Sequence, residues 1–246
     1  MPRLDPTNMR GSGNITDVTF VATAKMSMVE IIGRISSGGT APRGIRVLFG
    51  EGVWDISPAG HTITGQVELV SLTPGKTIFR RTSAGGTPTA PMITATGTMF
   101  RLQGIQLDDQ VGSYPAVKCS TNYCWIMDCV FPHCWRAIEI AGGNGARVQD
   151  NLIMVVRSTA YAIIFSGSSS NALCSGNNCQ TRHLAAMIYG SDEVSYSTFS
   201  CNVSAEVVPP GGSYYVTSTM FGNYVTCEGN VGTNLYRDPG DPVLSG

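Results

Sequence analysis

Charged side chains are scarce in this sequence of 246 residues: they make up 13% of it, and the formal net charge is −1. There is no block of lysines and arginines, which excludes binding of nucleic acid through its phosphates. No apolar run approaches the roughly 20 residues of a membrane-spanning helix, so we expect no membrane insertion. The N-terminus lacks the apolar core of a signal peptide, and we expect the protein to be made in a cytoplasm.

Nucleotide-binding and metal-binding motifs are also missing. The sequence has neither a P-loop nor a Rossmann fingerprint, and its three histidines form no pair at metal-ligand spacing. We therefore expect no cofactor and no metal.

Glycine is abundant, with 29 residues, and many serines, threonines and asparagines accompany it. This composition is typical of proteins with many turns and short strands. No long segment has apolar residues at a 3.6-residue period, because Gly or β-branched residues interrupt nearly every window. The sequence therefore predicts an all-β protein.

Two short patterns recur along the chain and stay interleaved through about half of it. The first has apolar ends and, in the middle, usually Gly or Asp, often followed by Asn. It starts at Leu102, Ile126, Val148, Cys174, Val194 and Met220, in steps of 24, 22, 26, 20 and 26 residues. The second is a short alternating strand that ends in small turn residues, and it starts at Met92, Ala116, Ala137, Ala162 and Ala186.

This spacing predicts coils of about 22–25 residues that stack at about 4.8 Å with parallel pairing between them. The alternation puts Cys119, Ile140, Phe165 and Tyr189 in one buried column. Gly, Asp and Asn suit a bend that needs a left-handed residue. A β-sandwich, the structural alternative, also has many short strands but would not repeat in a fixed phase.

Three asparagines share one position of the first pattern. They are Asn151, Asn177 and Asn223. In stacked coils their amides would hydrogen-bond from one coil to the next as a ladder.

With these two patterns, over residues 92–225, the chain resembles the right-handed parallel β-helices of the pectate-lyase-like superfamily, in the style of phage tailspikes and tail fibres. Residues 45–57 resemble the strand, Gly-rich turn and strand that often open such helices. We divide the chain into an attachment arm (1–20), a β-helix (21–232, with irregular coils to about residue 91 and regular coils over 92–232) and an extended tail (233–246).

Four of the eight cysteines, Cys119, Cys124, Cys129 and Cys134, follow one another at five-residue intervals. In the coils they fall mostly at inward or bend positions, where a small apolar residue fits. We therefore predict eight free thiols, because disulfides are rare in a reducing cytoplasm. The alternatives are disulfides between adjacent coils and metal binding, for which His133 is the only histidine in the run.

A β-helix of this kind often cleaves bacterial polysaccharide, and hydrolysis needs two carboxylates roughly 5–10 Å apart. The catalytic candidates are Asp128, Asp150, Asp108 and Asp109. Asp128 and Asp150 lie one coil apart in the bend column, where Asp bonds to its own backbone. Asp108 and Asp109 precede a loop, where a solvated turn is the competing interpretation.

Two tryptophans are the candidates for binding. Trp125 alternates with the inward Ile126, so it should point outward, toward a neighbouring subunit or a sugar. Trp135 directly follows Cys134, the last cysteine of the run.

We expect a structural protein of a phage or phage-like virion: a β-helical spike or fibre subunit, homotrimeric and located in the virion. Its arm or tail would join other virion proteins, and its surface would contact cell-surface polysaccharide without cleaving it. The alternatives are a polysaccharide-degrading tailspike enzyme of the same fold, either glycosidase or lyase, and a bacterial carbohydrate-binding protein.

Overall fold

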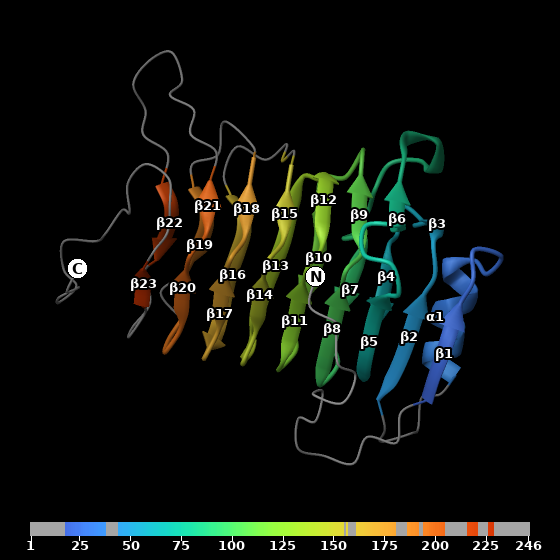
Figure 1. Cartoon of the computed structure of the whole chain (residues 1–246), viewed down its shortest axis with the longest axis horizontal. Coiled ribbons are helices and arrows are strands. Elements are labelled where there is room, and N and C mark those ends of the chain that lie inside the picture. Colours follow the sequence, from blue (N-terminus) through green and yellow to red (C-terminus); the bar gives the residue numbers. More distant parts are fainter. Residues whose placement is uncertain are drawn as a thin grey trace.

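The computed structural model describes residues 18–37, 44–154, 156, 161–180, 186–191, 194–204, 216–220 and 226–228. Over these residues the chain is a right-handed parallel β-solenoid of about six turns, which confirms the predicted fold class (Figure 1). In this part of the chain, no helix has the length and apolarity that crossing a membrane requires.

From β2 (Ile45–Phe49) onward the coils contribute strands to three sheets, and all strand pairs are parallel (Figure 1). In the order of pairing, sheet A contains β1 (Val18–Ala22), β2 (Ile45–Phe49), β5 (Gln66–Ser71), β8 (Met99–Gln103), β11 (Cys124–Met127), β14 (Arg147–Gln149), β17 (Leu173–Ser175), β20 (Thr198–Ser200) and β23 (Thr226–Glu228). Sheet B contains β3 (Gly52–Asp55), β6 (Thr77–Arg81), β9 (Gln106–Asp109), β12 (Val130–His133), β15 (Leu152–Ile153), β18 (Asn178–Cys179) and β21 (Val203–Ser204). Sheet C contains β4 (His61–Ile63), β7 (Ile93–Ala95), β10 (Pro115–Cys119), β13 (Arg136–Asn144), β16 (Tyr161–Ser170), β19 (Ala186–Gly190) and β22 (Val216–Met220).

The first sequence pattern corresponds to sheet A and the bend that follows it. Its first four predicted starts, Leu102, Ile126, Val148 and Cys174, are in register, as expected. In the next coil the register partner of Cys174 is Phe199, so the predicted start at Val194 was wrong. The start at Met220 was also wrong, because that residue ends β22 in sheet C.

The second pattern corresponds to sheet C, and its buried column contains Cys119, Ile140 and Phe165, as predicted. Gly190, instead of Tyr189, pairs with Phe165 in the next coil. A shift of one residue turns a side chain to the opposite face of a strand. Tyr189 therefore lies outside the column and stacks on Tyr161, with ring centroids 4.6 Å apart.

The bend after sheet A is left-handed in five consecutive coils, with φ between 54° and 70°. The residues there are Gly104, Asp128, Asp150, Gly176 and Cys201. This confirms the predicted bend column. Gly has no Cβ to oppose this conformation, and Asp tolerates it better than most residues.

Inside the bend, buried asparagines form the expected ladder. The Nδ2 group of Asn151 donates to Oδ1 of Asn177 at 2.8 Å, and Asn177 donates to Asn202 at 2.8 Å. Oδ1 of Asn151 also accepts the backbone N–H of Cys129 at 3.0 Å. Asn202 was not predicted, because the coil start at Val194 misplaced it, and Asn223 lies outside the described residues.

One helix, α1 (Met28–Ser37), lies beside β1 at the N-terminal end of the solenoid (Figure 1). Its buried residues Met28, Ile31 and Ile35 join the core and cover that end. The hydroxyl of Ser27 accepts the N–H of Glu30 at 3.2 Å, and the Glu30 carboxylate accepts the N–H of Ser27 at 2.6 Å. This capping box fixes where the helix begins. The helix was not predicted from the sequence, because ten residues give too short a periodic signal.

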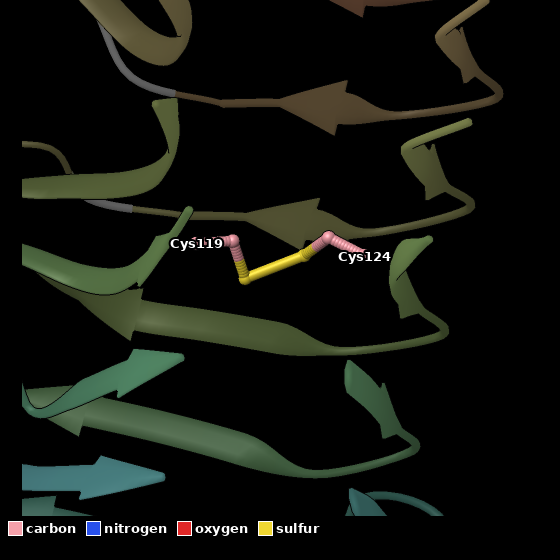
Figure 2. Close-up of a disulfide and its surroundings, with 2 residues drawn as sticks. All are labelled: Cys119 and Cys124. Atoms are coloured by element: carbon pink, nitrogen blue, oxygen red, sulfur yellow. A yellow bond between two sulfur atoms is a disulfide. The ribbon is translucent and has the colours of Figure 1, made fainter. Parts of the chain in front are cut away.

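Cys119 and Cys124 form a disulfide between the end of β10 and the start of β11, with Cα atoms 6.5 Å apart (Figure 2). The prediction of eight free thiols was therefore wrong at these two positions. The five-residue step spans one corner of a single coil, so both inward side chains meet there rather than across adjacent coils. Cys129, Cys134, Cys174 and Cys179 are buried free thiols, whereas Cys201 is an exposed one. Burial raises the pKa of the Cys129 thiol to about 12.

Candidate binding surface

Asp109 points into the solenoid and forms an ion pair with Arg81 of the preceding coil. Nε of Arg81 lies 3.0 Å from Oδ1 and its second terminal nitrogen 2.6 Å from Oδ2, with both side chains fully buried. Oδ1 also accepts the N–H of Gly112 at 2.8 Å. Asp109 therefore lies in a buried strand and not in a solvated turn, because Arg81 compensates its charge.

Asp108 lies on the opposite, outer face of β9, in a row with Asp55, Arg80 and His133. Its Oδ1 is 2.9 Å from Nδ1 of His133, and its Oδ2 accepts from Gln110 at 2.8 Å. Arg80 pairs with Asp55 at 3.2 Å in the same row. Asp108 is only 8% exposed, so the solvated-turn interpretation was wrong here too. One of its oxygens therefore contacts the next coil, and the other contacts a residue of its own coil.

Asp128 and Asp150 lie side by side in the bend column, and both are exposed. Oδ2 of Asp128 accepts from Nε2 of Gln103 at 2.9 Å. Partial burial, and then the nearby charge of Asp128, raise the pKa of the Asp150 carboxyl. A Cβ on Gly176 would collide with Oδ1 of Asp150, so the next coil provides a glycine beneath this carboxyl group. A carboxyl group with a raised pKa beside a second carboxyl group is a feature of sites for acid–base catalysis.

Trp125 lies on the outer face of β11, as expected, and is half-buried. It is in register with Arg101 and Arg147 of the two adjacent coils. Their guanidinium groups lie over the indole, 5.8 and 5.5 Å from the ring centroid. These cation–π contacts cover the ring from both neighbouring coils and leave little of it for a sugar.

Trp135 lies between β12 and β13 and is 37% exposed. Tyr114, equally exposed, precedes Pro115, which is the register partner of Arg136. The two aromatic side chains therefore occupy the same corner of consecutive coils.

The solenoid places these side chains at fixed intervals along its outside, which defines a class of protein: a right-handed parallel β-helix with polar and aromatic rows on its surface. No protein-family model matches the sequence, and no curated protein matches it.

Solved structures share this fold. The catalytic domain of a GH87 α-1,3-glucanase, in complex with nigerose, has a TM-score of 0.56 and 12% identity, covering 86% of this chain and 44% of that one. A pectin methylesterase in complex with a hexasaccharide has a TM-score of 0.50 and 11% identity, covering 85% and 80%. ORF18 of Geobacillus virus E2 has a TM-score of 0.49 and 13% identity, covering 86% and 62%. The chain spans less than half the length of the glucanase domain, and its β-helix fold is one that carbohydrate-active enzymes share.

Proposed function

We propose that the protein is a structural subunit of a phage or phage-like virion, a β-helical spike or fibre component that contacts host-surface glycans. One observation carries the proposal: the best-placed carboxylates serve the solenoid itself. Asp109 pairs with Arg81 inside it, Asp108 bonds to His133 and Gln110, and Asp128 holds a bend. Attachment needs a stiff rod with side chains at regular intervals, and in-register coils supply one.

Mass spectrometry of purified virus-like particles tests this role. We expect peptides of this chain in the particles at a level comparable with other structural components, and immunogold label at a spike or fibre. Finding the chain in the cell extract but not in the particles contradicts the proposal.

We also propose that the subunit is a homotrimer whose N-terminal arm and C-terminal tail join other virion proteins. Exposed apolar side chains such as Val21, Val29 and Leu72 support it, because contact with a partner covers such groups. Light scattering should give three times the chain mass of 26.1 kDa. A stable monomer at micromolar concentration contradicts the trimer.

The alternative is an enzyme that degrades polysaccharide, and Asp128 with Asp150 is the observation in its favour, because the pKa of the Asp150 carboxyl is raised. The glucanase and the pectin methylesterase show that this fold can support carbohydrate chemistry. We expect no new reducing ends and no unsaturated sugars when the protein is incubated with bacterial capsule or lipopolysaccharide. Cleavage that is lost in Asp150→Asn but retained in the exposed control Asp55→Asn would establish the enzyme.

A further inference from the structure

The corner between sheets C and A contains a second column of left-handed residues. It consists of Tyr123, Gly145, Asn171 and Tyr196, with φ of 55°, 73°, 51° and 49°. They are aligned, because each precedes by two residues a member of the paired series Trp125, Arg147, Leu173 and Thr198. We call these four residues the corner row.

The two tyrosines are unusual members of the corner row. Gly and Asn adopt a left-handed backbone at low cost, whereas a bulky side chain there is an outlier. Burial of the ring does not compensate for this cost, because Tyr123 is 52% exposed and Tyr196 is 63% exposed. Backbone strain of this kind concentrates at functional sites. Two exposed aromatic rings, kept where a smaller residue would be more stable, indicate a contact with another molecule.

Amides and hydroxyls lie between the two rings. Nδ2 of Asn171 donates to Oδ1 of Asn144 at 2.8 Å, and the hydroxyl of Ser170 lies 3.4 Å from the same oxygen. Oδ1 of Asn122 accepts the N–H of Asn144 at 3.1 Å. These bonds orient the amides. Within the described part of the chain, the Nδ2 groups of Asn122 and Asn144 have no acceptor, so they can donate to a ligand.

Gly145 provides the space that the Tyr123 ring occupies. A Cβ at this glycine would lie 3.0 Å from Cδ1 and 3.1 Å from Cε1 of Tyr123. The ring therefore lies against the backbone of the next coil, on the side of the column that leads to Tyr196. Three coil steps separate the two tyrosines, about 14 Å at the spacing of parallel strands.

We propose that the corner row binds a segment of a neutral oligosaccharide. Tyr123 and Tyr196 would contact the apolar faces of sugar rings at the two ends, and the amides would bond to hydroxyls between them. Tyr, Asn, Ser and Gly are the residues that binding surfaces use for rigid aromatic contact and adaptable hydrogen bonding. None of the corner-row residues, nor the preceding Asn122, Asn144, Ser170 and Ser195, carries a charge, which favours a neutral chain over an acidic one. This inference rests on the proposed glycan contact but not on the virion role.

A microarray of neutral and acidic oligosaccharides, probed with the full-length protein, tests the inference. We expect binding to neutral glycans, and titration with the best of them should show about five- to tenfold weaker binding for Tyr123→Ala or Tyr196→Ala. Tyr→Phe at either position should keep most of the affinity. Tyr114→Ala, at the corner between sheets B and C, is the matched control and should bind as the wild type does.

Tyr123→Asn and Tyr196→Asn separate loss of contact from loss of fold. Asn accepts the left-handed backbone, so both variants should melt at the same or a higher temperature while binding weakens. Wild-type protein that binds only acidic glycans, or no glycan, overturns the inference, as does binding that Tyr123→Asn and Tyr196→Asn leave unchanged or that Tyr114→Ala abolishes. If particles contain the chain but this test fails, the virion role stands and the corner-row site does not.

Discussion

The two halves of the solenoid interior are filled in different ways. Near the N-terminus, Phe49, Trp54 and Phe79 pack edge to face, with the Phe49 ring centroid 5.1 Å from Trp54 and 5.0 Å from Phe79. From the coil of Asn151 onward, the buried amides of Asn151, Asn177 and Asn202 are hydrogen-bonded from one coil to the next. The later coils also pack apolar groups, with the ring centroids of Phe165 and Phe199 5.1 Å apart, and they add directional hydrogen bonds between buried amides.

This difference shows that one backbone path can be stabilised by two kinds of interaction. Large rings must fit one another in volume. The early coils also vary in length and carry a helix at their end. A ladder needs only one amide at the same place in each coil, so the later coils keep one bend and one asparagine. The buried pair of Arg81 and Asp109 connects β6, the strand that contains Phe79, to β9 of the next coil.

Breaking the pair of Arg81 and Asp109 should have the largest effect of the four changes considered. Asp109→Ala leaves the guanidinium buried without its partner and should lower the free energy of unfolding by about 3–5 kcal/mol. Asp55→Ala removes an exposed pair with Arg80 and should change it by less than about 0.5 kcal/mol. Urea denaturation of both variants measures the difference. Equal effects would mean that burial of the ion pair does not make its loss more costly than loss of the exposed pair.

Asn177→Ala tests the ladder itself. It leaves the N–H of Asn151 and the carbonyl of Val148 without these bonds, and we expect a loss of about 2–3 kcal/mol. Asn178→Ala, at the exposed neighbouring position, is the control. Hydrogen exchange should show the loss in the later coils first. Uniform loss of protection along the whole solenoid would contradict the division into two regions.

Reducing the disulfide should have a smaller effect. The Cys119–Cys124 bond closes a short loop within one coil, and its contribution should be about 2 kcal/mol. Thermal melting with and without dithiothreitol measures it, and the Cys119→Ala, Cys124→Ala double variant should be insensitive to the reagent. Alkylation of both cysteines in unreduced, unfolded protein would show that the bond does not form.

The smallest expected effect concerns Asp150. Because the pKa of the Asp150 carboxyl is raised in the folded protein, folding is accompanied by proton uptake at pH values between its ordinary and its raised pKa. The corresponding stability is complete below the ordinary Asp pKa and is lost as pH rises through the folded value. As pH rises from about 3 to about 7, Asp150→Asn should therefore become more stable relative to the wild type, by less than about 0.5 kcal/mol. Melting temperatures across this range test the sign, and a relative gain toward low pH would contradict it.

The fold was predictable because its signal is a repeat. Leu102, Ile126, Val148 and Cys174 are in register as the pattern required. The predicted register failed at Ala186, which pairs with Tyr161 instead of Ala162. Small residues precede both of these alignments, so the sequence pattern fits them equally well. A slip of one residue reverses the face of every side chain that follows, which is why Tyr189 was misplaced.

The surface was less predictable than the coil. The outward direction of Trp125 follows from alternation, but the two arginines beside it come from coils 22–24 residues away and need the register to be known. The sequence analysis missed the left-handed tyrosines altogether, because residue type indicates a positive φ for Gly or Asn but not for Tyr. Nor did the five-residue cysteine spacing reveal that two thiols meet across one corner.

Helix α1 has a consequence for biosynthesis. It closes the end of the solenoid that leaves the ribosome first, and each later coil pairs with the one made just before it (Figure 1). The capped end can therefore act as a template on which the chain winds turn by turn during translation. We expect a nascent chain released after β9 to be protected from protease already, whereas a fragment that lacks α1 and β1 should have no surface from which to start.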